Sequence, residues 1–111
     1  RAPAAAALEQ KAERRQQREA AAAARQELLR QRRPLLKELE HLDQQMAALN
    51  AEAARLEAEL ADPELYAAGT DRKRLEALTR RQDEVRQTLE NVELRWLEVH
   101  TILEALPAPK R

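Results

Sequence analysis

The sequence predicts an all-α fold: an antiparallel two-helix coiled-coil hairpin with a short helical tip and a basic N-terminal helical arm. Two apolar ladders, each stepping by alternating threes and fours, indicate two helices that share one seam. A break marked by Pro63 and Gly69 separates the ladders and is short enough for the second helix to fold back on the first. A single Gly and few β-branched side chains argue against a sheet.

Composition supports long helices rather than a globule. Charged residues make up 36% of the 111 residues, there is no Phe, and the mean hydropathy is −0.78. The absence of Cys excludes disulfides and thiolate metal sites. No apolar run approaches the roughly 20 residues of a membrane span, and neither a starting Met nor a signal-type apolar core is present. We therefore expect a piece of a longer cytoplasmic protein.

The formal net charge is zero, but the charges are unevenly distributed. Residues 1–33 carry nine basic and four acidic side chains, a net of +5. Residues 34–71 carry two basic and nine acidic side chains, a net of −7, and residues 72–111 carry nine and seven, a net of +2. An acidic helix beside a basic-leaning one suits pairing within the chain, whereas the basic arm suits an anionic partner.

Residues 1–33 are predicted to form a basic Ala/Arg-rich linker or helical arm, with a frayed end over residues 1–8. Their apolar content is mostly Ala, so the segment can bury little surface and is expected to be a solvated helix or a partly ordered linker. Pro34 disfavours helix at Arg33 and fits a first helical turn, so the first core helix is predicted to start or kink there.

The coiled-coil hairpin is predicted over residues 34–106, and its first helix over residues 34–61, on the order of 40 Å long. The ladder of this helix consists of Leu35, Leu39, Leu42, Met46, Leu49, Ala53, Leu56 and Leu60.

Residues 62–70 are predicted to form the helical tip. Asp62 can cap a helical turn in which Pro63 takes the first position, and Gly69 can supply a left-handed stop. We interpret Tyr66 as a plug under the tip in preference to a contact residue.

The second helix is predicted over residues 71–106, capped by Thr70 or Asp71 and ended by Pro107 and Pro109, with residues 107–111 as a tail. Within its ladder Gln82 is polar, either as a layer that sets the register or as a side chain that reaches solvent. The ladder consists of Leu75, Leu78, Gln82, Val85, Leu89, Val92, Trp96, Val99, Leu103 and Leu106.

Charge pairing favours one register of the hairpin. When Leu35 packs on Trp96 and Leu56 on Leu75, five flanking pairs have opposite charges, although each exposed pair contributes only about 0.2–1 kcal/mol. A shift of one heptad places Trp96 on Leu42 and leaves one attractive pair. The five predicted pairs are Glu59 with Arg74, Glu52 with Arg81, Glu38 with Arg95, Asp43 with Arg86 and Glu57 with Arg72.

No catalytic constellation is evident, so this chain is predicted not to be an enzyme. One Gly cannot build a phosphate-binding loop, and carboxylates on an exposed helix lack the concave site that acid–base chemistry requires. His41 and His100 fall far apart and are interpreted as solvated imidazoles rather than metal ligands. Trp96 lies on the seam, which favours core packing over base stacking.

Basic side chains form two groups of candidates for phosphate contact. The arm has fewer acidic neighbours and is the better candidate, although a solvated linker fits equally well. For the tip, pairing within the hairpin is favoured over phosphate contact, because three of its five cations have predicted acidic partners. The nucleic-acid-binding candidates are Arg14, Arg15, Arg18, Arg30, Arg32, Arg33, Arg72, Lys73, Arg74, Arg80 and Arg81.

The tip and the tryptophan together resemble a known pattern. The stretch Leu-Ala-Asp-Pro-Glu-Leu-Tyr at residues 60–66, followed in the return helix by Arg-Trp-Leu-Glu at residues 95–98, resembles the C-terminal coiled-coil domain of ABC-F ATPases, the soluble tandem ATP-binding-cassette proteins. The basic run at residues 11–33 resembles the linker leaving their second ATPase domain. The positions interpreted as architectural are Asp62, Pro63, Tyr66, Gly69 and Trp96.

This resemblance implies a longer protein that binds and hydrolyses ATP with Mg²⁺ in two cassettes, while this chain itself holds no cofactor and no catalytic or metal-binding residue. Members of the family act on ribosomes as translation factors or in nucleic-acid transactions, and this domain binds DNA in some relatives. One hypothesis is therefore binding to the backbone of DNA or ribosomal RNA.

The alternative hypothesis is a coiled coil that contacts protein and positions or regulates the ATPase domains, on the ribosome or elsewhere. We expect a monomer, because the seam is satisfied within the chain; a free-standing scaffold would require oligomers. Few aromatic side chains are exposed, which argues against a stacking platform for single strands.

Overall fold

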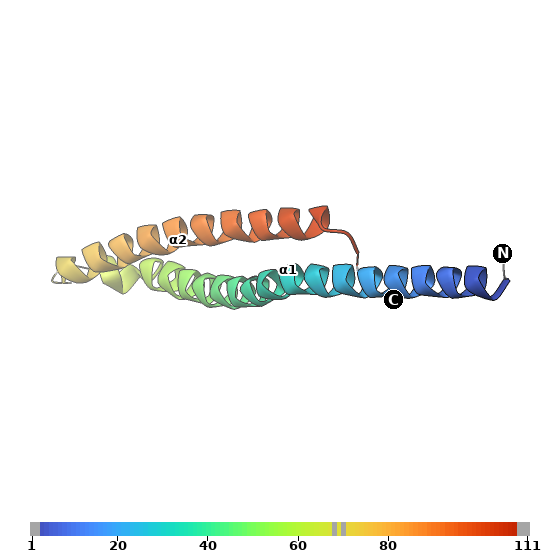
Figure 1. Cartoon of the computed structure of the whole chain (residues 1–111). Helices are drawn as coiled ribbons and strands as arrows, with labels where there is room; N and C mark the ends of the chain where they lie inside the picture. Colours follow the sequence, from blue (N-terminus) through green and yellow to red (C-terminus); the bar gives the residue numbers. More distant parts are fainter. Residues whose placement is uncertain (1–2, 68, 70, 109–111) are drawn as a thin grey trace.

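The computed structural model describes residues 3–67, 69 and 71–108. Its elements are the long helix α1 (Pro3–Leu60), the single 3₁₀ turn η1 (Pro63–Tyr66) and the helix α2 (Arg72–Ala105). The two helices run antiparallel, and α1 continues far beyond the end of α2 (Figure 1). The molecule measures 103 × 16 × 15 Å. The predicted all-α hairpin with a projecting arm is confirmed.

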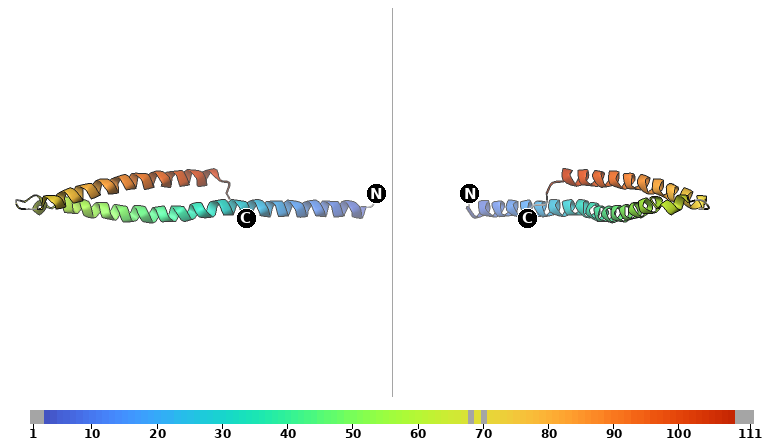
Figure 2. Two further views of the ribbon diagram at one scale, coloured as in Figure 1. Left: turned by 60° about the vertical axis from the view of Figure 1, so that its left-hand side comes forward. Right: turned by 180° about the vertical axis from the view of Figure 1, so that it is seen from behind.

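The arm and the first helix of the hairpin form one continuous helix. The sequence predicts a helix start or kink at Pro34, whereas α1 begins at Pro3 and contains Pro34 in its interior. We call residues 3–33 of α1 the arm. Figure 2 shows α1 straight along the arm and curved where it runs beside α2. Pro34 is exposed, so its ring projects toward solvent while the helix continues past the one backbone hydrogen bond that proline cannot donate.

The core is a narrow seam between α1 and α2. Val85 and Val99 are almost fully buried, at 1% and 0% exposure, and α1 contributes Leu42 and Leu56 from the facing ladder. Around Leu42, Val92 and Val99 pack further ladder residues that are only partly buried. These are Leu35, Leu39, Met46, Leu49, Trp96 and Leu103. Along the described residues this seam is one side chain deep.

Two bidentate ion pairs establish the register. Arg95 donates from Nε and Nη2 to Glu38 at 2.6 and 2.7 Å, and Arg81 donates from Nη2 to Glu52 at 2.7 Å. Both are pairs that the sequence predicts. Arg95 and Arg81 each also bind a glutamate one turn ahead on α2, at 3.1 and 3.2 Å. Each arginine therefore connects the two helices and stabilises its own.

The other three predicted pairs are wrong among the described residues. Arg86 pairs with Asp83 on its own helix at 3.6 Å, and Asp43 accepts a hydrogen bond from Trp96 instead. Neither Glu59 and Arg74 nor Glu57 and Arg72 form an ion pair. A local partner needs less ordering of long side chains than a partner on the other helix, and exposed pairs gain little from that ordering.

Trp96 makes a hydrogen bond to α1 that the sequence does not predict. Its indole Nε1 donates to Asp43 Oδ1 at 2.8 Å, beside Leu42 and eight residues beyond Leu35 along the chain. Helical side chains lean toward the N-terminus of their own helix. In an antiparallel pair that direction carries a long side chain of α2 toward higher residue numbers on α1. The ion pairs thus match the favoured register, while the predicted Leu35–Trp96 contact stays a prediction.

The tip is capped as the sequence predicts, but the residue buried beneath it is Leu65 and not Tyr66. Asp62 accepts from the Glu64 amide at 3.0 Å, Pro63 begins η1, and Gly69 has a positive φ of 88°. Leu65, not Tyr66, is the buried plug: Leu65 is 8% exposed and Tyr66 is 59% exposed. The ring of Tyr66 stays outside because its hydroxyl donates to the Leu60 carbonyl at 2.6 Å, which closes the end of α1.

The ends of α2 lie within one residue of the prediction. Asp71 is the N-cap and accepts from the Lys73 amide at 2.9 Å; the alternative cap, Thr70, lies outside the described residues, as does Pro109. The helix ends at Ala105, with Leu106 as its C-cap and Pro107 following. The chain then turns toward the arm, so that Pro107 and Ala108 line a shallow hollow with Leu28 and neighbouring residues of α1.

Candidate functional site

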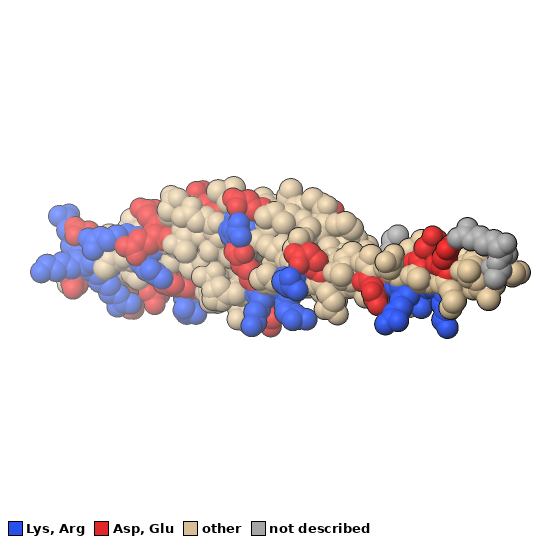
Figure 3. Space-filling model, viewed as in Figure 1, with Lys and Arg blue, Asp and Glu red and all other residues tan. Residues whose placement is uncertain are grey.

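The basic candidates fall into two groups at separate places on the rod. The arm carries Arg14, Arg15, Arg18, Arg30, Arg32 and Arg33, and the tip end of α2 carries Arg72, Lys73, Arg74, Arg80 and Arg81. The part of α1 between Arg33 and the tip is about 27 residues, or about 40 Å. Figure 3 shows basic side chains at the tip end of the molecule and along the arm. The structure therefore does not join the two groups into one site.

Most tip cations have no carboxylate partner within the described part of the chain. Arg72, Lys73 and Arg74 form the first turn of α2, are exposed, and make no ion pair with another described residue. Arg80 is likewise exposed and unpaired within the described chain. Only Arg81 is held by carboxylates, so the predicted pairing of Arg72 and Arg74 within the hairpin is wrong.

The tip cations sit among acidic neighbours, however. A shallow hollow beneath them is lined by four carboxylates and by Arg74 and Leu65. The first turn of a helix also carries the positive end of the helix dipole, where cations are unfavourable for stability and reinforce the local positive potential. The tip therefore presents a small positive cap beside a negative surface. The four carboxylates are Glu59, Asp62, Glu64 and Asp71.

The arm cations have fewer acidic neighbours than the tip cations. Arg15 pairs with Glu19 at 3.2 Å and Arg30 with Glu27 at 2.7 Å, both on the surface of α1. The other arm candidates make no ion pair with a described residue, and all but the half-buried Arg32 are exposed. They are Arg14, Arg18, Arg32 and Arg33. Such cations are available to phosphate oxygens without first releasing a partner.

The paired arginines at the hairpin are a contrasting case. The hydrogen bond from Arg95 lowers the pKa of Glu38, although desolvation opposes the effect, and the hydrogen bond from Arg81 does the same to Glu52. The two carboxylates in turn raise the pKa values of Arg81 and Arg95. Arg81 thus already binds two carboxylates of the hairpin, which makes it the weakest candidate for phosphate contact.

Trp96, His100 and Asp43 form a small cluster on one flank of the seam. The rings of Trp96 and His100 lie 4.0 Å apart at 54°, and the indole donates to Asp43. His100 is half-buried, which corrects the prediction of a solvated imidazole, whereas His41 is exposed. The spacing of four residues between Trp96 and His100 could have revealed this contact, because such residues share a helix face.

Apolar side chains are exposed on the outer face of α2, away from the tip. Leu94 and Leu97 are 59% and 55% exposed. Leu97 also lines a shallow, mainly apolar hollow together with Met46, Trp96 and Glu93. Because neither Leu94 nor Leu97 belongs to the seam ladder, the heptad analysis passes over both of them. They form an exposed apolar surface separate from the candidate cations.

The described residues contain neither a cluster that could hold a metal ion nor a helix that could span a membrane. No group of three or more His, Cys, Asp or Glu side chains among residues 3–67, 69 and 71–108 could hold a metal ion. Over the same residues, neither long helix has a stretch apolar enough to cross a membrane.

Comparison with known proteins places the hairpin in a family. The family model described as the ABC transporter C-terminal domain matches residues 30–101, well over half of the chain. No curated protein and no solved structure matches this chain. The matched range begins at the end of the arm and includes the acidic helix, the tip and α2 up to Thr101. The chain therefore belongs to the ABC transporter C-terminal domain family.

Proposed function

We propose that this chain is the non-catalytic C-terminal domain of a soluble ABC-F-type tandem ATPase and that it binds the phosphate backbone of DNA or ribosomal RNA. The observation that carries the proposal is the set of exposed cations, at the arm and at the tip, that have no carboxylate partner among the described residues. Lys and Arg side chains supply salt-sensitive affinity that is independent of nucleotide sequence. The cytoplasmic location, and the ATP and Mg²⁺ used by the cassettes, belong to the same proposal.

Shape supports binding rather than catalysis. A rod 16 Å across with a seam one side chain deep has room for contacts along its surface but not for an enclosed reaction site. Carboxylates are abundant, yet the two with shifted pKa values are held ionised by arginines. Neither is poised as a general acid or base near neutral pH.

Fluorescence anisotropy tests the proposal. Labelled duplex DNA and a labelled structured fragment of ribosomal RNA are titrated with the chain at about 50 and 200 mM salt. If six or more phosphates are contacted, affinity should fall about 10³-fold or more between these salt concentrations. A variant with Gln at positions 14, 15, 18, 72, 73 and 74 should bind far more weakly. Absence of binding to both ligands at the lower salt would refute the proposal.

A second candidate function is supported by the exposed leucines of α2. In this reading the hairpin contacts the ATPase domains of the longer protein, or a ribosomal protein, through Leu94 and Leu97. Binding through apolar surface should depend little on salt and should weaken when Leu94 and Leu97 become Gln. The arm and tip variants should leave such binding unchanged, which separates the two functions.

A further inference from the structure

The unpaired cations of the arm lie on one face of α1. Successive residues of an α-helix turn by about 100°, so side chains can be placed around the axis from their numbers alone. Six arm cations, none of them ion-paired to a described residue, fall within an arc of about 100°. They are Lys11, Arg14, Arg18, Arg25, Arg32 and Arg33, and we call them the basic stripe. Arg15 lies at its edge and is shared with Glu19.

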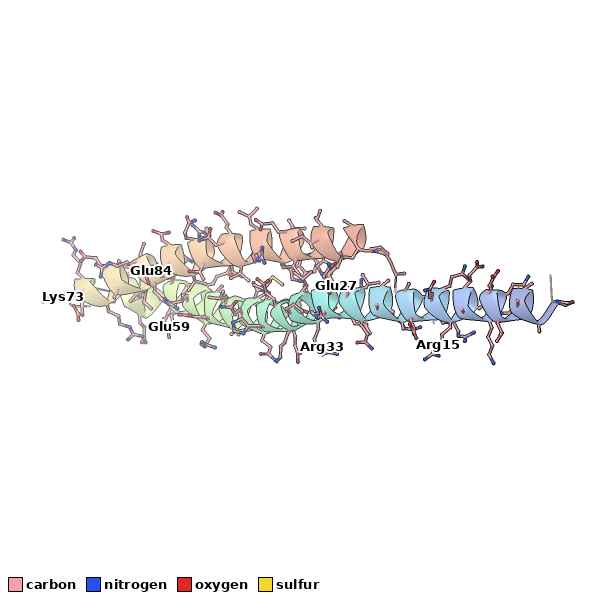
Figure 4. All side chains as sticks on the ribbon, viewed as in Figure 1. Arg15, Glu27, Arg33, Glu59, Lys73 and Glu84 are labelled. Atoms are coloured by element: carbon pink, nitrogen blue, oxygen red, sulfur yellow. The ribbon has the colours of Figure 1, made fainter. Side chains whose placement is uncertain are left out.

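The acidic side chains of the arm lie away from this face. Glu9, Glu13 and Glu27 fall within about 30° of the opposite side of the helix, and Glu19 lies beside the stripe. Figure 3 shows basic side chains along the lower side of the arm and acidic ones above them. In Figure 4, Arg15 and Arg33 point to the same side of α1, whereas Glu27 lies on the other side. The segregation is therefore a feature of the folded molecule.

Within the described residues, most of the stripe lies away from the hollow that the end of the chain forms with the arm. α2 ends at Ala105, and the tail that follows reaches the arm beside Ala21, Ala24, Leu28 and Gln31. These residues lie on another side of α1, and of the stripe only Arg25 touches the edge of that hollow. Pro107 and Ala108 thus lie over part of the arm, and of the stripe they share this hollow only with Arg25.

The dimensions of the stripe suit one kind of ligand. From Lys11 to Arg33 it is about 33 Å long, close to the 34–36 Å of one turn of B-form DNA. Four of its members, Lys11, Arg18, Arg25 and Arg32, recur every seven residues, about 10.5 Å apart. An α-helix with its side chains is about 10–12 Å across, and the major groove of B-form DNA is about 12 Å wide. The deep, narrow major groove of A-form RNA does not admit a helix.

We propose that the basic stripe is the main nucleic-acid contact of this chain and that its ligand is duplex DNA, with the arm seated at the major groove and its cations on the flanking phosphates. This inference rests on the proposed function and deepens it, since it chooses the arm over the tip and DNA over RNA. It also adds Lys11 and Arg25 to the candidate residues and removes Arg30, which lies off the stripe and is paired with Glu27.

A variant that moves charge without removing it gives the sharpest test. In R18Q/Q16R/R32Q/Q31R the composition and net charge are unchanged, but two cations leave the stripe for other sides of the helix. The full chain and this variant are titrated against a labelled duplex DNA of about 20 base pairs and the matching RNA duplex. We expect at least a tenfold loss of DNA affinity at about 50 mM salt, with unchanged helical circular dichroism.

A second pair of variants compares the arm with the tip. R14Q/R18Q/R25Q removes three cations from the stripe, and R72Q/K73Q/R80Q removes three from the tip. The stripe variant should make the dependence of log K on log salt shallower by about 3, whereas the tip variant should change it little. The wild-type chain should bind duplex DNA more tightly than duplex RNA.

The outcomes separate this inference from the proposed function. Equal binding by the charge-moved variant and the wild type, a greater loss in the tip variant, or tighter binding to RNA would overturn the stripe as a DNA site while leaving nucleic-acid binding intact. Absence of binding to either duplex and to the structured ribosomal RNA fragment would overturn both. Tight DNA binding that is lost only in the stripe variants would support both.

Discussion

Single residues explain how so thin a molecule holds one register. Arg81 and Arg95 each contact one carboxylate across the seam and another on their own helix. A bidentate arginine needs its partner in one orientation, so it is more specific about position than an apolar contact. Trp96 adds a third constraint on the register, because its indole N–H donates to Asp43 on the other helix. The apolar ladder of the sequence does not reveal this polar contact.

The bond between Trp96 and Asp43 should be measurable by a double-mutant cycle. Trp96→Phe removes the donor and Asp43→Ala removes the acceptor, so the double variant should lose less stability than the sum of the single changes. The coupling free energy should be about 1 kcal/mol, because the bond is charge-assisted but solvent-exposed. Urea unfolding followed by circular dichroism at 222 nm measures it. Strict additivity of the two changes would show that the bond contributes nothing.

At the scale of the element, the sequence predicts what depends on local chemistry and on the seam. The two ladders, the Asp62 and Asp71 caps and the left-handed Gly69 were all predictable, because each follows from a residue type in its immediate context. The continuity of α1 was not. Pro34 taken by itself predicts the end of a helix. The helical segments on both sides of Pro34 are long enough to keep α1 continuous across it.

Position 34 offers a direct test of this explanation. In Pro34→Ala the new amide can donate to the Arg30 carbonyl, and a proline in a helix interior costs about 3 kcal/mol relative to alanine. Amides of the arm should therefore exchange with deuterium more slowly than in the wild type. Pro63→Ala is the matched control, since a first-turn residue gains no helical hydrogen bond. Equal exchange in the Pro34→Ala arm and the wild-type arm would contradict the explanation.

The ion pairs between the helices should make hairpin stability depend on pH. The arginine hydrogen bonds lower the pKa values of Glu38 and Glu52 below those of the unfolded chain, which are about 4.3. A carboxyl with a lowered folded-state pKa stabilises the fold above its unfolded pKa and loses that contribution as pH falls through its folded value. The pairs should thus stabilise the hairpin near neutral pH and weaken progressively below about pH 4.3.

The variant E38Q/E52Q isolates this effect, because it keeps the shape of both side chains and removes their titration. Its urea midpoint should lie below that of the wild type at pH 7, and the difference should shrink as the pH is lowered toward 2. Other carboxylates are common to both chains and cancel in the comparison. A difference that stays constant over this range would mean that the pairs do not contribute through their charge.

For the whole molecule, the decisive property is length. The radius of gyration is 27.7 Å, whereas a compact domain of this size would have about 13 Å. Heptad periodicity predicts the hairpin, and the residue numbers of the cations predict one charged face once the arm is known to be a helix. What periodicity could not predict is that arm and hairpin share one helix, so that the stripe is held in a fixed direction relative to the tip.

Small-angle X-ray scattering tests that rigidity. The wild-type chain should give a radius of gyration near 27.7 Å that does not change with protein concentration, as expected for a monomeric rod. Replacing Arg33 and Pro34 by Gly should lower the value, because two adjacent glycines favour a flexible joint and let the arm swing toward the hairpin. R14G/R18G is a control with the same number of glycines, placed away from the junction. A wild-type value already close to that of the junction variant would mean that α1 bends freely at Pro34 and that the stripe has no fixed direction relative to the hairpin.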